Sequence, residues 1–279
     1  MTTRSDAEVR TFVRERYSKF VEEPLKTGDA SCCNEAENSS CCSSASSNVL
    51  QLYEDPASVE LPSDVTDIAL GCGDPVTLAT LQPGLTVLDL GSGGGIDCFL
   101  AAQKVGPSGR VIGVDMTPAM IDRARANQVK MGLENVDFRL GEIEHLPVAD
   151  NSVDVIISNC VINLSPDKPQ VFNETYRVLR PGGKIAVSDI VTSGPLPENV
   201  KANLSAWAGC IAGALDVNDY MVTMEAAGFV DVKLEPVYFP PEMIDEALED
   251  LGEQAAMAGD RAPDIYKSVF SAKITARKP

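Results

Sequence analysis

The stretch VLDLGSGGGID, residues 87–97, decides how this chain of 279 residues folds. A short apolar run leads into a loop of glycines, and a helix-forming stretch follows from Ile96. A strand, a glycine loop and a helix in this order bring backbone N–H groups and the positive end of a helix to a ligand. The stretch therefore predicts the first strand and the ligand-binding loop of a parallel sheet.

Strand-like and helix-like stretches alternate through the middle of the chain, which is typical of a parallel sheet with helices on both faces. Two C-terminal strands are predicted to join this sheet antiparallel. The prediction is an α/β, Rossmann-like fold with a mostly parallel seven-stranded sheet. The predicted strands are residues 85–90, 110–116, 135–140, 152–158, 184–190, 231–239 and 266–278. Helices are predicted over 5–23, after 96, and over 117–132, 167–180, 197–215, 217–230 and 242–258.

Charge and composition exclude several classes of function. The formal net charge of -18 and the pI of about 4.4 oppose binding to nucleic acid or to an anionic membrane, because both need clustered Lys and Arg. No apolar run approaches the length of a membrane span, and the charged N-terminal stretch is unlike a signal peptide. We therefore expect a cytoplasmic protein whose eight cysteines are thiols unless a redox cycle oxidises them transiently.

The acids around the glycine loop indicate which cofactor it binds. Asp115 ends the second predicted strand about 20 residues after the loop, where a carboxylate accepts hydrogen bonds from ribose hydroxyls. A dinucleotide fingerprint would need glycine at Ile96, and Asp89 would repel a pyrophosphate. An acid suits the ammonium and sulfonium groups of S-adenosylmethionine. The predicted cofactor-binding residues are Asp89, Gly91, Ser92, Gly93, Gly95, Asp115, Met116, Glu142, Ile143 and Asn159.

Residues 66–190 resemble the class I S-adenosylmethionine-dependent methyltransferases. Six stretches in order are similar to the arsenite methyltransferases: IALGCGDP, LDLGSGGGIDCFLAA, VIGVDMTPAMIDRAR, GEIEHLPVADNSVDVIISNCVINLSPDK, VLRPGGKIAVSDI and WAGCIAGAL. The resemblance covers most of the chain after Leu50. It implies transfer of a methyl group from S-adenosylmethionine to trivalent arsenic.

Cys72, Cys160 and Cys210 each lie within one of these stretches. Their wide spacing fits no compact zinc motif, and zinc usually takes a fourth ligand. Trivalent arsenic is soft and binds three thiolates, so the resemblance implies that these cysteines hold the substrate. The alternative is that each is a small buried apolar side chain, as free cysteines commonly are.

Residues 27–48 are polar, are predicted to form a mobile linker and contain two pairs of adjacent cysteines. The resemblance implies that Cys32, Cys33, Cys41 or Cys42 pairs with Cys72 when arsenic is reduced during turnover, and that thioredoxin or glutathione restores the thiols. Two alternatives stay open. The pairs capture arsenite and pass it on, or they are incidental thiols of a solvated loop.

Three smaller predictions complete the assignment. His145 is expected to have a structural role, and Cys98 to lie in the core. Relatives often carry tyrosine where this chain has Leu70, so an aromatic contact to the cofactor must come from Tyr17 or Tyr53, or is absent. The predicted units are 1–50, with the N-terminal helix and Cys-rich loop; 51–193, the cofactor-binding core; and 194–279, the arsenic-site segment and last strands.

Two other functions remain compatible with the pattern. A carbon or oxygen methyltransferase of the quinone or sterol type has the same fold but no need of three cysteines. A non-catalytic arsenite-binding protein has the cysteines but no need of an intact cofactor loop.

Overall fold

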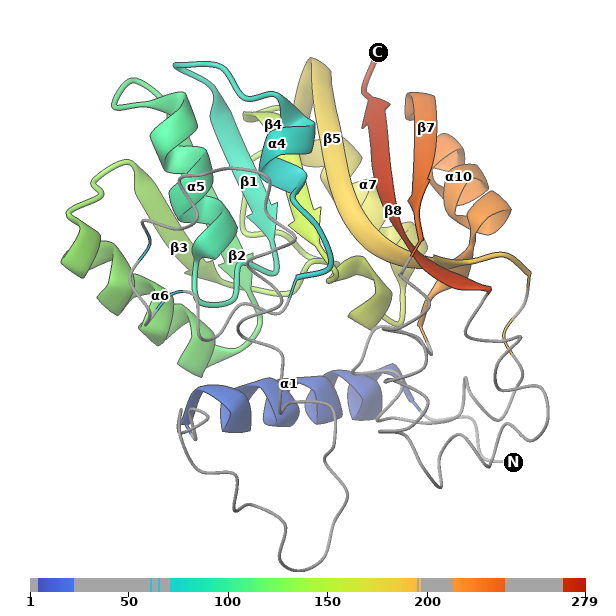
Figure 1. The fold of residues 1–279 in the computed structure, drawn as a ribbon, viewed down its shortest axis with the longest axis horizontal. Coiled ribbons are helices and arrows are strands. Elements are labelled where there is room, and N and C mark those ends of the chain that lie inside the picture. The colour runs from blue at the N-terminus through green and yellow to red at the C-terminus, as the bar shows by residue number, and fades with distance from the viewer. Residues whose placement is uncertain are drawn as a thin grey trace, which may run out of the picture.

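The structure is a computed structural model, and it describes residues 5–22, 61, 65, 71–194, 196, 213–238 and 268–279. Its centre is one mixed sheet with the strand order β3-β2-β1-β4-β5-β8-β7, and the short β6 also pairs with β5 (Figure 1). The strands are β1 (Thr86–Leu90), β2 (Arg110–Asp115), β3 (Val136–Leu140), β4 (Val153–Asn159), β5 (Leu179–Thr192), β6 (Leu215–Asp216), β7 (Val230–Val237) and β8 (Val269–Arg277). Strands β1 to β6 pair in parallel, whereas β8 pairs antiparallel with both β5 and β7.

Helices cover both faces of this sheet. They are α1 (Asp6–Glu22), α4 (Pro75–Ala79), α5 (Ile96–Val105), α6 (Pro118–Met131), α7 (Lys168–Val178), α10 (Val217–Ala226) and the 3-10 turn η3 (Ile162–Leu164). Because side chains alternate along a strand, Val87 packs towards α4, α5 and α6, whereas Leu88 packs towards α7 and α10. Both side chains are fully buried, so the sheet has two apolar cores.

Local sequence chemistry sets the helix boundaries. The side chains of Asp74 and Asp167 accept hydrogen bonds from the backbone N–H groups of Thr77 and Gln170, which caps α4 and α7. Helix α6 has Pro118 in its first turn and ends at Gly132 with a φ of 65°, as its sequence predicts.

The described residues form eight strands rather than the predicted seven, because the short β6 also joins the sheet. Several boundaries also differ from the predictions. Strand β5 begins at Leu179 rather than at residue 184, because the Arg-Pro-Gly-Gly stretch is accommodated as an irregularity in the β4–β5 register. The helix predicted over 197–215 includes Leu215, which belongs instead to β6. Helix α10 ends at Ala226, and Val230 already belongs to β7.

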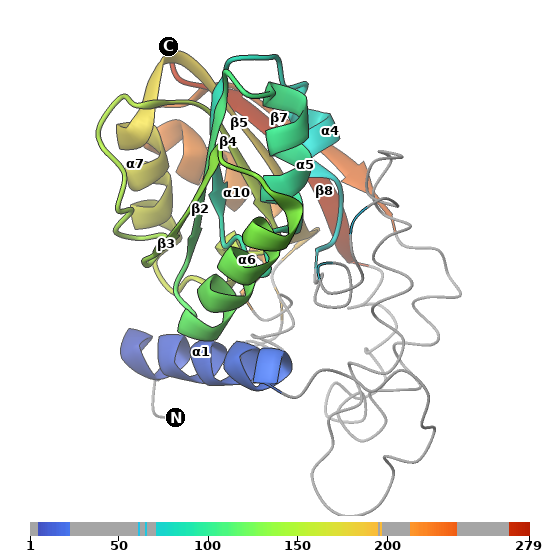
Figure 2. The same cartoon turned by 90° about the vertical axis from the view of Figure 1, so that its left-hand side faces the viewer.

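Helix α1 lies across the carboxyl ends of the parallel strands, where Figures 1 and 2 show it below the sheet. Val9 and Val13 on its inner face are buried, and α1 contacts α6. The helix thus covers the edge at which open α/β folds bind ligands. In the part of the chain that the structure describes, no helix is both long and apolar enough to cross a membrane.

Candidate active site

A cavity with about 940 Å³ of empty space, part of it open solvent, lies between α1 and the carboxyl ends of β1, β2 and β4. This position is the switch point of the sheet, because β2 lies on one side of β1 and β4 on the other. Seven of the ten predicted cofactor residues line it: Gly91, Ser92, Gly93, Asp115, Met116, Ile143 and Asn159.

The glycine loop leaves room for a ligand beside Asp115. Gly93 has a φ of 50°, and a Cβ atom built there would meet no protein atom within 4 Å. Gly91 serves a different need, because its Cβ would lie 2.3 Å from the Val161 side chain. Gly93 and Thr117 donate backbone hydrogen bonds to the Asp115 carboxylate at 2.9 and 2.8 Å, respectively. These bonds hold the carboxylate in place and leave lone pairs for further donors.

Asp89 does not lie in the cavity wall where the sequence predicted it, and Asp97, which was not predicted, does. The side chain of Asp89 is 2% exposed and does not line the cavity; its Oδ2 accepts a hydrogen bond from Cys98 Sγ at 3.2 Å. Asp97, in the first turn of α5, does line it. Burial raises the pKa of Asp89 well above its ordinary value, and the nearby Asp97 raises it further. Of Asp89 and Asp97, the acid that lines the cavity is therefore Asp97.

Two other predicted residues also lie outside the cavity wall. A Cβ on Gly95 would lie 2.8 Å from the Phe99 ring, so this glycine allows α5 to pack closely. Glu142 forms ion pairs with Arg10 and Arg14 of α1.

The cavity wall also includes residues of helix α1. Arg10, Val13 and Tyr17 line the cavity, so Tyr17 is the aromatic side chain that lies there. Arg10 donates to the buried carboxylate of Glu144 at 3.2 Å, and Ser165 donates to the same oxygen at 2.6 Å. Tyr53 lies outside the described residues.

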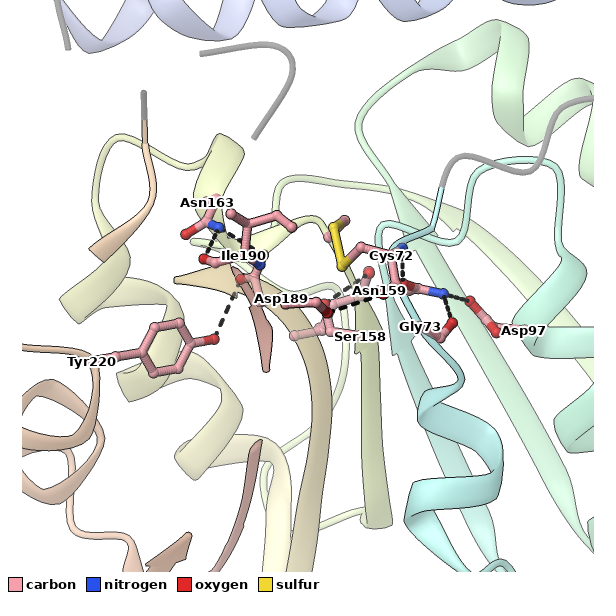
Figure 3. Close-up of a disulfide and its surroundings, with 12 residues drawn as sticks. Cys72, Gly73, Asp97, Ser158, Asn159, Asn163, Asp189, Ile190 and Tyr220 are labelled. Atoms are coloured by element: carbon pink, nitrogen blue, oxygen red, sulfur yellow. Dashed lines mark hydrogen bonds between the residues drawn. A yellow bond between two sulfur atoms is a disulfide. The ribbon is translucent and has the colours of Figure 1, made fainter. Parts of the chain in front are cut away.

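Cys72 and Cys160 are 88 residues apart in the sequence and are joined by a disulfide, with their Cα atoms 5.9 Å apart (Figure 3). Cys160 follows directly after β4, lines the cavity and has a φ of 58°, which is unusual for a residue other than glycine. Its backbone N–H donates to the Ser188 carbonyl at 2.8 Å, which ties the turn to β5.

Asn159 connects the Cys72 loop to the cofactor cavity. Its Oδ1 accepts from the Cys72 backbone N–H at 2.8 Å, and its Nδ2 donates to the Gly73 carbonyl and to Asp97 (Figure 3). The Ser271 hydroxyl of β8 donates to the Cys72 carbonyl at 3.0 Å. Cys72 is therefore held from two sides, by β4 and by β8.

The disulfide lies in a small apolar cluster apart from the two main cores. Cys160, Ile190, Leu196 and Val269 form this cluster, and Cys72, Leu164 and Ala214 pack against it. The sulfur atoms thus lie in surroundings that are poor in hydrogen-bonding groups and next to the cofactor cavity.

The comparisons with known proteins agree with this geometry. A family model described as a methyltransferase domain matches residues 81–228. The chain is 47% identical to the arsenite methyltransferase of Halobacterium salinarum, over 99% of this chain and 68% of that protein. This chain belongs to the arsenite methyltransferases. The predicted fold class and family are therefore confirmed.

Other members of the family match over shorter stretches. The arsenite methyltransferase of Aquipseudomonas alcaligenes is 38% identical over 78% of this chain and 64% of its own length. For the mouse enzyme the identity is 40% over 61% of this chain, and the chain spans only 47% of that protein. The crystal structure of the arsenic(III) S-adenosylmethionine methyltransferase of Chlamydomonas reinhardtii superposes with a TM-score of 0.62 at 35% identity, covering 82% of this chain and 72% of that one.

The remaining residues singled out from the sequence are His145 and the other cysteines. Cys98 is fully buried in the core, as expected, and burial followed by the charge of Asp89 raises the pKa of its thiol well above the ordinary value. His145 is exposed on the loop after β3. Cys210 and the four N-terminal cysteines, Cys32, Cys33, Cys41 and Cys42, lie outside the described residues.

Proposed function

We propose that this chain transfers a methyl group from S-adenosylmethionine to trivalent arsenic held by the thiolates of Cys72, Cys160 and Cys210. The observation that carries the proposal is the meeting of Cys72 and Cys160 beside the cofactor cavity, although 88 residues separate them. A quinone or sterol methyltransferase would give this thiol pair no task.

The third thiol is within reach of the same place. Cys210 precedes Ala214 by four residues, and Ala214 packs against the apolar cluster that contains Cys160. Four residues span at most about 14 Å, even when the backbone is fully extended. This upper limit on the distance between Cys210 and Ala214 supports the assignment of Cys210 as the third thiol.

Arsenite binds to reduced thiols and does not bind to a disulfide. Two electrons and two protons from a thiol reductant, such as thioredoxin or glutathione, convert the Cys72–Cys160 disulfide into two thiols. Three thiols then displace the three hydroxyls of neutral arsenous acid and release three water molecules. Cys98 does not compete, because its raised pKa keeps it as a thiol and the thiolate is the form that binds soft centres.

The cavity residues fit S-adenosylmethionine. Asp115 would accept hydrogen bonds from ribose hydroxyls, Gly93 leaves space against the backbone, and Asp97 would hold the ammonium group. When bound, the cofactor supplies a methyl group on a sulfonium sulfur, which the arsenic lone pair takes as a C–As bond replaces a C–S bond. Asn159 touches both Asp97 and the Cys72 loop, so it fixes the distance between the two halves of the site.

No general base is needed, because no proton leaves arsenic during methyl transfer. The apolar side chains of Ile190, Leu196 and Val269 pack with Cys160. The main task of the protein is then to align the two reactants. We place the reaction in the cytoplasm, where thiol reductants are abundant, and assign the four N-terminal cysteines to delivery of arsenite or of electrons.

Mass spectrometry of arsenic species after incubation with arsenite, S-adenosylmethionine and a thiol reductant tests the proposal. We expect methylated arsenic from the parent protein and a loss of roughly 100-fold or more in Cys72→Ser, Cys160→Ser and Cys210→Ser. Cys98→Ser is the matched control, because it changes a buried thiol outside the site and keeps a donor to Asp89.

Cofactor binding separates loss of the arsenic site from loss of the fold. Each serine variant should bind S-adenosylmethionine as the parent does, measured by calorimetry. Methylation at the parent's rate in all three variants would contradict the thiolate assignment.

A further inference from the structure

A buried carboxyl group lies behind the Cys160 turn and takes no part in the reaction proposed above. Asp189, near the end of β5, has no exposed surface, and neither do Asn163 and Tyr220, which hydrogen bond to it. Figure 3 shows these three side chains on the side of the disulfide opposite to Asp97. Burying a carboxylate is costly unless hydrogen bonds compensate, so its presence calls for a physical reason.

The Asp189 carboxylate ties the turn after Cys160 to the sheet. Asn163 belongs to η3, three residues after Cys160, and its Nδ2 donates to Asp189 Oδ1 at 2.8 Å and to the Ile190 carbonyl at 2.6 Å. The Ile190 backbone N–H donates to the same Oδ1 at 3.0 Å. The turn that sets the direction of Cys160 is thus fixed to β5 by side-chain as well as backbone bonds.

The other oxygen of Asp189 reaches the C-terminal part of the chain. The Tyr220 hydroxyl of α10 donates to Asp189 Oδ2 at 3.4 Å, and the Tyr220 ring packs edge-on against Phe172 with centroids 5.4 Å apart. Tyr220 follows Cys210 by ten residues. One carboxylate therefore connects the element that carries Cys160 with the helix that follows Cys210.

This network also lies next to the other reactant. Leu164 of η3 lines the cofactor cavity and packs against the apolar cluster of Cys160, and Ile190 belongs to that cluster. The turn that Asp189 anchors therefore lies between the Cys160 thiol and one residue of the cavity wall, whereas the glycine loop and Asp115 lie on other elements.

We propose that Asp189 is a positioning residue that holds Cys160 against Cys72 through Asn163, and ties α10 to β5 through Tyr220. The effect on arsenic methylation rests on the proposed function. The positioning of the Cys72 and Cys160 thiols does not. Lys168, whose Nζ donates to the Ser165 carbonyl at 2.9 Å, is the cation whose charge acts on Asp189.

The equilibrium between the Cys72–Cys160 disulfide and dithiothreitol measures this positioning directly. Reduced protein and oxidised dithiothreitol exchange two electrons and two protons. The equilibrium constant of this exchange gives the effective concentration of the Cys72 thiol near the Cys160 thiol. We expect Asp189→Ala to lower this effective concentration by roughly tenfold or more, and Tyr220→Phe by about threefold. Asp189→Asn should restore it, because an amide oxygen still accepts from Asn163 and its N–H₂ group donates to the Tyr220 oxygen.

Tyr176→Phe is the matched control for Tyr220→Phe. Tyr176 packs edge-on against Phe229 on the same side of the sheet, with centroids 5.5 Å apart. An effective concentration equal to the parent's in both Asp189→Ala and Tyr220→Phe overturns the inference. If Asp189→Ala does not fold, equal effective concentrations in Tyr220→Phe and Tyr176→Phe are sufficient to overturn the inference.

Steady-state kinetics then connect the network to arsenic. Asp189→Ala should raise the KM for arsenite and lower kcat, with the dissociation constant of S-adenosylmethionine within about twofold of the parent's. If the role of Asp189 were purely structural, Asp189→Ala would lower the melting temperature without changing the arsenite constants selectively. An inactive parent with a disturbed thiol equilibrium in Asp189→Ala would contradict the proposed function and leave the inference supported.

Discussion

Asp189 makes the stability of the protein depend on pH in a direction opposite to that of a carboxylate whose pKa is lowered by a cation. Burial raises its pKa from 3.8 to about 7, and hydrogen bonds from Ile190 and Asn163 and the charge of Lys168 oppose the rise. Between these two values the unfolded chain has lost this proton and the folded chain has kept it. The contribution of Asp189 to the free energy of unfolding therefore falls as pH rises from about 4 to about 7, and stays low above that.

Asp189→Asn removes this pH dependence, because an amide does not ionise. We expect the free energy of unfolding of Asp189→Asn, relative to the parent, to grow between pH 4 and pH 8 by up to about 4 kcal/mol. Urea unfolding of both proteins at several pH values measures the difference. The same difference at every pH would show that Asp189 carries no raised pKa.

Residue identities in the site were predictable to different degrees. Cys72 and Cys160 were found because both lie in stretches that resemble a known family. Asp89 was chosen for its charge, but it faces α5 on the same side of β1 as Val87, one residue before the strand ends. Asp97 is the better candidate for contact with the cofactor, because the first turn of α5 brings it to the carboxyl edge of the sheet.

At the scale of elements, helix α1 closes the cofactor cavity by ion pairs as well as by packing. Arg10 pairs with Glu144, whose side chain is only 5% exposed, so removing Arg10 leaves a buried carboxylate poorly compensated. We expect Arg10→Ala to weaken binding of S-adenosylmethionine by roughly threefold to tenfold, measured by calorimetry.

Lys19→Ala is the matched control for Arg10→Ala, since it removes one positive charge from an exposed position of α1. Its affinity should equal that of the parent. Equal affinities in Arg10→Ala and Lys19→Ala would mean that α1 does not hold the cavity closed through this pair.

Most long elements were predictable from apolar period and capping residues. Helix α6, with Pro118 at its start and Gly132 at its end, carries its boundaries in its own sequence. The short elements were not predictable, because α4 has five residues and β6 has two, too few for a period to be recognised. Their conformations depend on partners elsewhere, as when β6 forms by pairing with β5.

At the scale of the whole molecule, sheet topology brings together residues that the sequence keeps apart. Strand β4 lies between β1 and β5, so Cys160 emerges at the switch point, and β8 joins β5 and fixes the Cys72 loop through Ser271. Sequence alone predicted that the carboxyl edge would carry the site. It could not predict the separation of the two thiols, which depends on side-chain bonds from three strands.

The Cys72–Cys160 disulfide also constrains the unfolded chain. It closes a loop of 88 residues that contains β1, β2, β3 and β4, and loop-closure entropy for that length corresponds to roughly 4 to 5 kcal/mol. Reduction should therefore lower the melting temperature of the oxidised protein by roughly 10 °C.

Calorimetric scans with and without dithiothreitol measure this shift. Cys72→Ser cannot form the disulfide, so its melting temperature should not respond to the reductant through this bond. Arsenite added to the reduced parent should recover part of the loss, because a ligand that bridges the same thiols binds the folded state, in which they are already close together, more tightly than the unfolded chain. A parent insensitive to reductant, or a Cys72→Ser variant with an equal shift, would show that this pair does not set the stability of the oxidised protein.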